Sequence, residues 1–410
     1  MSTQIFEAMA GKITDEMSLI AQKEGLDENA VLENVKMGKI VILKNNQRKN
    51  SIPCAIGENL NVKICANIGS FDFESEIKQE LDKVRVIEQI GVDVLMDLSC
   101  DKNSDEIRKK VLEASTLPVG SAPLLQTFKT MTDNGENVAK LTKDKILADI
   151  EKHCSDGVDF VALECAVTKF VVEQLQKQDR LTGIVSASGG MLANYILVTG
   201  LENPLYQYFD EILDILRTYD VTLCLASALV SGSICDATDR AQVAETVVMG
   251  ELIRRAKKSG VQVMTQGLGH ISLDKIQNAV NTTKQMTEFA PLFAYGPFVC
   301  DCAIGYDNIT SAIGASVAAQ HGADMLTCVT PAENLGIANI KQIREGIMCA
   351  KIAAHSADVA KKNKKALEAE VAIGSARKKS DTNALKDCAI DKTIFANYPQ
   401  FAQNAPYVRF

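Results

Sequence analysis

Residues 158–165 read VDFVALEC, a run in which Asp159 and Glu164 are the only polar side chains. A strand with one face in water alternates apolar and polar residues, whereas this run is apolar on both faces. The pattern therefore predicts a strand covered on both sides, as in a parallel sheet flanked by helices. Glu164 stands at the carboxyl end of this strand.

Similar runs recur from residue 62 onward, separated by amphipathic stretches with helical periodicity. Strands that alternate with helices predict parallel β/α units, and about eight such units predict an α/β fold, a (β/α)8 barrel of the TIM type. The rival is an open doubly wound sheet, but the sequence has neither a GxGxxG run after its first strand nor a Walker A loop. Nine strands are predicted, one more than the barrel needs: residues 62–69, 92–99, 117–124, 158–165, 182–188, 221–227, 261–267, 292–299 and 323–330. The predicted helices cover residues 74–90, 143–153, 169–177, 208–218, 240–258 and 273–289.

Two flanking segments complete the predicted organisation. Residues 1–58 are expected to form a small helical layer, in which Thr14 caps a helix that ends at Gly25. The barrel is expected over residues 59–363, ending with a long helix from about residue 340. Residues 364–410 are expected to form a helical and irregular extension whose last part, NYPQFAQNAPYVRF, has no periodicity.

The composition excludes several classes of protein. The chain has 410 residues, 46% of them hydrophobic, and a net charge of −8, which argues against nucleic acid as a partner. No apolar run is long enough to span a membrane, and no signal-peptide pattern is present. We therefore expect a cytoplasmic protein whose twelve cysteines are reduced.

Residues at the carboxyl ends of the predicted strands are the candidate site residues, because that end of a barrel carries the active site. His270 lies on a glycine-flanked turn and is either a metal or acid–base residue or a structural histidine. Glu164 is either a site carboxylate or an interior carboxylate held by an ion pair. The candidates are Asn67, Met96, Asp97, Glu164, Ser186, Ser188, Ser227, Gln266, His270, Asp301, Tyr306, Glu333 and Asn334.

Two local patterns allow more than one interpretation. Cys300 and Cys302 flank Asp301 and would share one face of a strand, where they are either two of the ligands of a zinc ion or, as we expect, buried structural cysteines. The turn SASGGMLAN, residues 186–194, places glycines near a helix start and could bind phosphate, although such turns are common.

Eight stretches, taken in order, resemble the phosphomethylpyrimidine synthase family. They are VKICANIG, VDVLMDLS, TGIVSASGG, GSICDATDRAQ, VQVMTQGLGH, AIGYDNITSAIGA, CVTPAENLG and KIAAHSADVAK, and the resemblance covers essentially residues 1–375. It implies a (β/α)8 barrel, a radical S-adenosylmethionine lyase acting on aminoimidazole ribotide, and a homodimer. The family's paralogues include 5-hydroxybenzimidazole synthases, which make the lower ligand of cobamides.

The same resemblance assigns roles to individual residues and shows where this chain departs from the pattern. Asn67 and Met96 keep two substrate-contacting residues, and His270 matches one of two metal-binding histidines. The second metal position holds Asn334, whose amide is a poorer zinc ligand than imidazole, so we expect weak zinc binding. The resemblance implies further substrate-binding positions, and they are Glu164, Ser186, Ser188, Ser227, Gln266 and Phe293. Ser186 keeps the serine of a phosphate-binding SRG run that lacks its arginine here, and the other five positions have changed type.

The family's CxxCxxxxC run, which supplies the ligands of a [4Fe–4S] cluster, does not occur in these 410 residues. Three functions follow as hypotheses. The first is a radical S-adenosylmethionine lyase in 5-hydroxybenzimidazole synthesis. The second is an auxiliary subunit in a heterodimer with a cluster-bearing paralogue. The third, ranked last, is phosphomethylpyrimidine synthase in thiamin biosynthesis.

Overall fold

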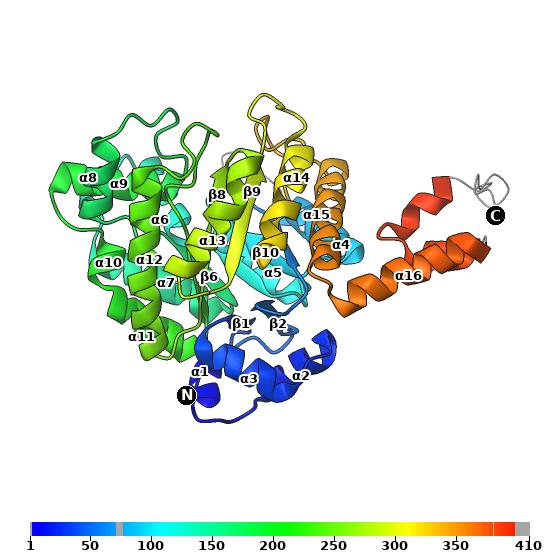
Figure 1. Ribbon diagram of the computed structural model, residues 1–410. Helices are drawn as coiled ribbons and strands as arrows, with labels where there is room; N and C mark the ends of the chain where they lie inside the picture. The colour runs from blue at the N-terminus through cyan, green and yellow to red at the C-terminus, as the bar shows by residue number, and fades with distance from the viewer. Residues whose placement is uncertain (1, 71–76, 380, 398–410) are drawn as a thin grey trace.

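A closed barrel of eight parallel strands forms the centre of the computed structural model, which describes residues 2–70, 77–379 and 381–397 (Figure 1). The strands follow the order β10-β3-β4-β5-β6-β7-β8-β9, so the predicted barrel is confirmed. They are β3 (Lys63–Ile68), β4 (Val94–Asp97), β5 (Val119–Ser121), β6 (Phe160–Leu163), β7 (Thr222–Leu225), β8 (Val263–His270), β9 (Leu292–Phe298) and β10 (Met325–Thr327).

Large side chains fill the barrel interior. Phe160, Met264, Phe293 and Met325 belong to one buried cluster inside the ring of strands. Gly120 makes room for this filling, because a Cβ atom there would lie 2.0 Å from the ring of Phe160. The interior is therefore a packed core, and ligand chemistry is confined to the ends of the barrel.

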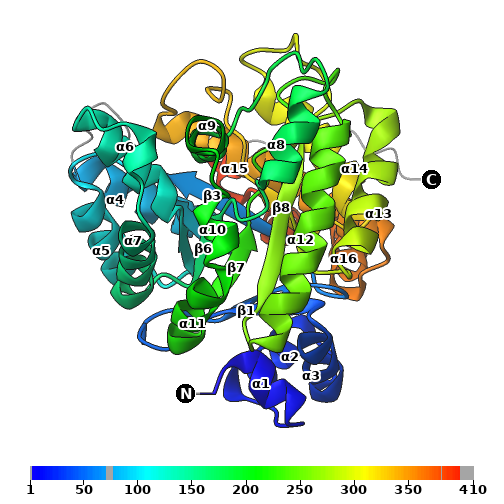
Figure 2. The same ribbon diagram turned by 90° about the vertical axis from the view of Figure 1, so that its left-hand side faces the viewer.

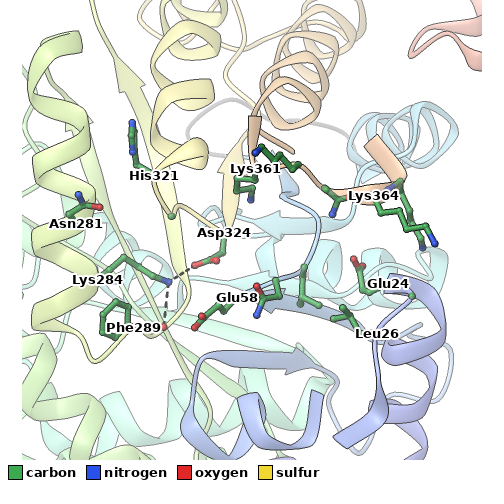
Figure 3. Close-up of a pocket in the computed structure, with 18 of the residues that line it drawn as sticks. Glu24, Leu26, Glu58, Asn281, Lys284, Phe289, His321, Asp324, Lys361 and Lys364 are labelled. Atoms are coloured by element: carbon green, nitrogen blue, oxygen red, sulfur yellow. Dashed lines mark hydrogen bonds and ion pairs between the residues drawn. The ribbon is translucent and has the colours of Figure 1, made fainter. Parts of the chain in front are cut away.

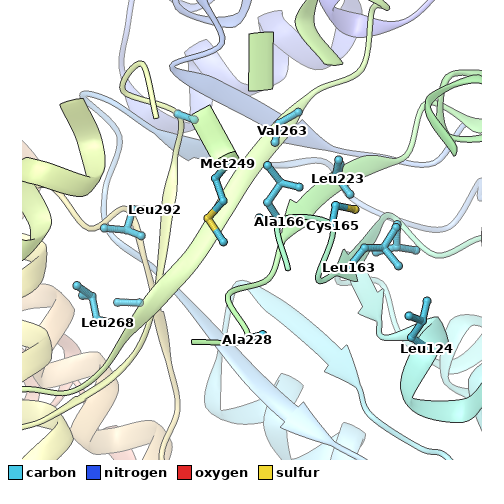
Figure 4. Close-up of a cluster of buried hydrophobic side chains, with 14 of the residues drawn as sticks. Leu124, Leu163, Cys165, Ala166, Leu223, Ala228, Met249, Val263, Leu268 and Leu292 are labelled. Atoms are coloured by element: carbon cyan, nitrogen blue, oxygen red, sulfur yellow. The ribbon is translucent and has the colours of Figure 1, made fainter. Parts of the chain in front are cut away.

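Helices cover the outside of the barrel and bury the other face of each strand. Met249 of α12 belongs to the same cluster as Leu223 of β7, Val263 of β8 and Leu292 of β9 (Figure 4). Each such side chain contributes about 1.5–3 kcal/mol on full burial. The surrounding elements are α4 (Ile77–Ile90), α5 (Ser104–Ala114), α6 (Pro123–Asp133), η1 (Val138–Lys140), α7 (Lys143–Asp156), α8 (Lys169–Gln176), α9 (Ala187–Thr199), α10 (Pro204–Gln207), α11 (Phe209–Tyr219), α12 (Arg240–Lys258), η2 (Leu273–Lys275), α13 (Ile276–Met286), α14 (Asp307–Gln320) and α15 (Ile340–Ala360).

The segment predicted as a ninth strand, residues 182–188, is a loop up to Ser186 and continues as the first residues of α9, so that prediction is wrong. The backbone amides of Leu181 and Thr182 donate to the carboxylate of Asp236 at 2.8 and 2.9 Å, which holds the segment against the loop after β7. Gly183 then takes a left-handed conformation with φ of 62°. Ser186 caps α9, its Oγ accepting from the amide of Gly189 at 3.2 Å.

The N-terminal layer contains helices α1 (Gln4–Met9), α2 (Asp15–Glu24) and α3 (Glu28–Met37), together with an antiparallel hairpin of β1 (Ile40–Leu43) and β2 (Cys54–Gly57). The expectation of helices throughout residues 1–58 is therefore wrong for the hairpin. Val41, Leu43 and Ile56 belong to the cluster inside the barrel. The Gln262 side chain, just before β8, exchanges two hydrogen bonds with the backbone of Ile42, at 2.7 and 3.0 Å. The hairpin thus closes the amino-terminal end of the barrel (Figure 2).

The C-terminal helices extend away from the barrel. They are α16 (Lys364–Lys379), α17 (Thr382–Cys388) and the short η3 (Lys392–Asn397), and α16 points outward from the end of α15 (Figure 1). The start of the predicted helix 74–90 and most of the final 397–410 stretch lie outside the described residues. No helix in the described part of the chain is long and apolar enough to cross a membrane.

Candidate functional site

Asn67 and Met96 lie side by side near the carboxyl ends of β3 and β4, where the strand register pairs them directly. Met96 belongs to the interior cluster. The Oδ1 atom of Asn67 is buried and accepts no hydrogen bond from the described residues. A buried carbonyl oxygen without a donor costs about 1–3 kcal/mol, so this atom is suited to a ligand that brings a donor.

Gln266 and Phe293 are likewise paired across two strands, β8 and β9. Phe293 is buried inside the barrel, whereas Gln266 is half-buried. Gln266 and Ser227 both line a cavity of about 300 Å³ bounded by α12 and α13. The structure thus brings these two predicted residues to one cavity.

Glu164 follows β6 and is held by the turn at the start of α9. Its Oε1 accepts a hydrogen bond from the hydroxyl of Ser186 at 3.1 Å and a short one from the hydroxyl of Ser188. Burial raises the pKa of Glu164, against the lowering effect of these two hydroxyls. Three predicted site residues therefore form one network, and no residue that the structure describes makes the ion pair that our alternative interpretation of Glu164 required.

A second buried carboxylate, Glu245 of α12, was missed by the sequence analysis. Its side chain accepts a short hydrogen bond from the Ser227 hydroxyl, and it accepts the backbone amides of Ala228 at 2.8 Å and Leu229 at 3.2 Å. Burial raises the pKa of Glu245 to about 7, and the charge of Glu164 contributes in the same direction. A carboxyl group with such a pKa exchanges a proton near neutral pH, which suits general acid–base chemistry.

One sequence signal could have revealed Glu245. It lies on the apolar face of its helix, between Ala241 and Met249, both of which are buried. An acidic residue at helical spacing within an apolar stripe predicts a buried carboxylate with a specific partner.

His270 ends β8 and is oriented by Asp301 of the following loop. Its Nδ1 lies 2.8 Å from Asp301 Oδ1, and its ring stacks on Phe298 with centroids 4.5 Å apart. Burial would raise the pKa of Asp301, but hydrogen bonds from His270, Ile234 and Ser233 hold it below its usual value. The ionised carboxylate accepts only, so Nδ1 carries a proton and Nε2 is the ring nitrogen left to face a ligand. Metal-binding histidines are commonly oriented in this way.

Asn334, the other predicted metal position, is engaged elsewhere. Its Nδ2 donates to Asp307 Oδ1 at 2.6 Å, and the side chain is exposed. Across residues 2–70, 77–379 and 381–397, no group of three or more His, Cys, Asp or Glu side chains is arranged to hold a metal ion. His270 and Asn334 are therefore held by different aspartates and do not form a preassembled metal site.

A larger cavity of about 660 Å³ lies at the opposite end of the barrel (Figure 3). It is bounded by the N-terminal layer at Glu24 and by Lys284 of α13, whose Nζ forms an ion pair with Asp324 at 2.8 Å. Asp324 precedes β10, so this cavity is at the amino-terminal ends of the strands. That end of a barrel carries stability more often than catalysis, so the candidate site remains at the carboxyl ends.

Comparison with known proteins identifies the family of the chain. Residues 3–405 match the Radical SAM ThiC family. The chain belongs to this family. Three curated relatives are named phosphomethylpyrimidine synthase. That of Desulforamulus reducens is 43% identical over 95% of this chain and 90% of its own length. That of Methanocaldococcus jannaschii is 41% identical over 95% of this chain and 91% of its own length. That of Thermus thermophilus is 42% identical over 92% of this chain and 87% of its own length.

Among solved structures, the dihydropteroate synthase of Yersinia pestis is similar at a TM-score of 0.39. The identity is 11%, over 72% of this chain and 91% of that chain. This similarity is too low to bear on function.

Membership of the Radical SAM ThiC family implies S-adenosylmethionine and an iron–sulfur cluster, which cysteine thiolates hold. The cysteines of this chain do not fit such a cluster. Seven are buried and three, Cys235, Cys300 and Cys302, are exposed. Burial raises the pKa of Cys54, for example, to about 12, which keeps the thiol protonated and inert. No step of the chemistry is therefore assigned to a cluster on these residues.

Proposed function

We propose that this chain binds aminoimidazole ribotide at the carboxyl end of its barrel and takes part in the radical rearrangement that makes phosphomethylpyrimidine. The observation that carries this proposal is the identity of about 43% over 95% of the chain to relatives of that name. From the sequence alone we ranked the benzimidazole route first, and the relatives support the pyrimidine route better. Free thiols throughout the described cysteines are consistent with the reducing cytoplasm as the place of the reaction.

Each part of the proposed site has a definable task. The unpartnered Asn67 Oδ1 would accept a hydrogen bond from an amine or hydroxyl of the ribotide. Glu245, with a pKa of about 7, would exchange a proton with groups that reach the Ser227 side of the site. The turn Ser186–Ser188 lies at the start of α9, where backbone amides favour a phosphate, and protonation of Glu164 would remove the opposing charge.

Two observations support alternatives within the same family. Gln266, Ser227 and Phe293 stand where the family pattern has other residue types, which favours a changed product such as 5-hydroxybenzimidazole. The described cysteines do not form a cluster site, so the cluster ligands would come from outside these residues, either from a further segment of this chain in a homodimer or from a cluster-bearing paralogue in a heterodimer. Metal binding through His270 is a third open point, and we expect it to be weak.

The first experiment measures ribotide binding by calorimetry, without any radical chemistry. We expect binding to the wild-type chain, and about tenfold weaker binding for Asn67→Ala because one buried hydrogen bond is lost. Asn281→Ala, in the cavity at the other end, is the matched control and should leave affinity unchanged. Equal affinity for both variants would exclude the Asn67 end of the barrel as the binding site.

The second experiment tests turnover under anaerobic conditions with S-adenosylmethionine, a reductant and ribotide. The chain is assayed alone and mixed with a cluster-bearing member of the family that carries a disabled barrel. Product only in the mixture supports the heterodimer, whereas product from the chain alone supports an autonomous enzyme. The product mass separates pyrimidine from benzimidazole, and absence of product in both arms would contradict the proposed lyase.

A further inference from the structure

All three exposed cysteines lie on two adjoining loops at the carboxyl end of the barrel. Cys235 is in the loop after β7, and Cys300 and Cys302 are in the turn after β9. The Sγ atoms of Cys300 and Cys302 are 3.3 Å apart. The expectation that this pair is buried is therefore wrong, because the strand ends at Phe298 and the following turn carries both thiols to the surface.

The turn between the two thiols is anchored by its central residue. The Asp301 carboxylate accepts hydrogen bonds from Ser233 Oγ and the amide of Ile234, both at 2.9 Å, and lies 2.8 Å from His270 Nδ1. These contacts fix the turn to the barrel wall. A disulfide is about 2.05 Å long, so oxidation requires the two sulfur atoms to approach by roughly 1.3 Å.

We propose that Cys300 and Cys302 form a redox-active dithiol that is converted reversibly to an intramolecular disulfide by low-molecular-weight disulfides. One thiolate attacks a disulfide RSSR, forms a mixed disulfide and releases RS⁻, which takes up the proton lost by the thiol. The second cysteine then attacks the Sγ of the first, the bond between that Sγ and the RS group breaks, and the second RS⁻ leaves as RSH with the proton of the second thiol. Two electrons pass from the pair of cysteines to RSSR, and two RSH leave with the two protons.

The contacts of the pair predict selectivity and reversibility. Buried thiols such as Cys328 are shielded from reagents, whereas Cys300 and Cys302 are exposed and already in contact. A disulfide that spans a single intervening residue is strained, and strained, exposed disulfides are the easily reduced ones. Asp301 lies inside the ring that the disulfide would close. Oxidation would therefore shift Asp301 and change the hydrogen bond between its carboxylate and His270 Nδ1. The inference does not depend on which product the barrel makes.

The test uses the full reduced chain, incubated anaerobically with glutathione disulfide at constant pH. Free thiols are then blocked in the folded state, and the peptides are analysed by mass spectrometry with fragmentation. We expect loss of two hydrogen atoms between Cys300 and Cys302, reversed by excess reduced glutathione, while Cys328 on the same tryptic peptide stays unmodified. In the wild type, the second cysteine should close the disulfide faster than glutathione is lost from the mixed disulfide by other routes. The mixed disulfide should therefore be roughly tenfold less abundant in the wild type than in Cys300→Ser, where closure cannot occur.

The variants separate the possible results. Cys300→Ser and Cys302→Ser should each stop at a glutathione adduct on the remaining thiol, and Cys235→Ser should behave as wild type. A trivalent arsenical, which needs two neighbouring thiols, should bind the wild type and Cys235→Ser and fail to bind either of the other variants. Two separate adducts on the wild type, a bond that includes Cys235, or unmodified Cys300 and Cys302 would each overturn the proposal.

Discussion

Two carboxylates at the amino-terminal end of the barrel, Asp159 and Glu24, pair with cations, whereas Glu164 and Glu245 at the carboxyl end have hydroxyls and backbone amides as partners. Asp159 pairs with Arg48 at 2.6 Å, and Lys63 pairs with Glu24 at 2.7 Å. Glu164 and Glu245 accept hydrogen bonds from serines and amides instead. A neighbouring cation stabilises the charged form of a carboxylate, whereas at Glu164 and Glu245 burial raises the pKa despite the lowering effect of these hydrogen bonds. The difference separates carboxylates that hold the barrel together, such as Asp159, from carboxylates that can exchange protons, such as Glu245.

The largest expected effect lies at the amino-terminal end. Asp159→Ala removes the partner of Arg48 and the acceptor for the amides of Asn45 and Val119, at 3.0 and 2.8 Å. An uncompensated buried cation costs about 3–5 kcal/mol, so the free energy of unfolding should fall by that amount in denaturant titration. Asp133→Ala, which breaks an exposed pair with Lys129, is the control and should cost less than about 1 kcal/mol. Similar losses for both variants would remove the contrast between buried and surface pairs.

The next effect is a pH dependence at the other end. The folded state raises the pKa of Glu245 to about 7 from an ordinary 4.5, so between these values the folded state binds more protons than the unfolded state. The contribution of this group to stability is therefore present below pH 4.5 and decreases as the pH rises through 7, by about 3 kcal/mol in all. Glu245→Gln cannot ionise and should flatten this decline. An unchanged slope between pH 5 and 8, measured by chemical denaturation, would show that Glu245 does not titrate there.

Packing between the two ends gives a third, smaller effect. Gly120→Ala places a Cβ against the Phe160 ring and should destabilise the protein by about 1–3 kcal/mol. The double variant Gly120→Ala with Phe160→Leu should recover part of the loss, because the smaller side chain makes room. Strict additivity of the two single losses would mean that the residues do not share the interior layer.

The smallest expected change in stability is at Asn67. Asn67→Ala removes a buried oxygen that has no donor among the described residues, so we expect the free energy of unfolding to change by less than about 1 kcal/mol. The same variant should lose ribotide affinity, which distinguishes a binding residue from a structural one. A large loss of stability would place Asn67 with the structural residues of the opposite end.

The sequence predicted the barrel because each β/α unit carries its own local pattern of apolar and helical periodicity. Residues 182–188 were wrongly predicted as a strand because their backbone amides bond to Asp236, a tertiary contact that no local pattern records. The hairpin was missed because β1 and β2 are four residues each and are separated by a long connection.

The candidate site was predicted in parts. The rule that site residues follow the strands located Glu164, Ser186 and Ser188, and the structure added that they bond to one another. The rule did not locate Glu245, because this residue lies within a helix and not at the end of a strand. Asn334 was expected beside His270, yet its amide bonds to Asp307, a contact that depends on how two loops fold together.

The hairpin that closes the barrel has a consequence during synthesis. β2 ends at Gly57, and the last barrel strand ends at Thr327, so the ribosome makes the closing hairpin long before the barrel is complete. At common elongation rates this interval is roughly 15–50 seconds. Throughout it, Val41, Leu43 and Ile56 lack the interior cluster that later buries them. The nascent chain therefore presents a short apolar ribbon to chaperones before the barrel that covers it has been translated.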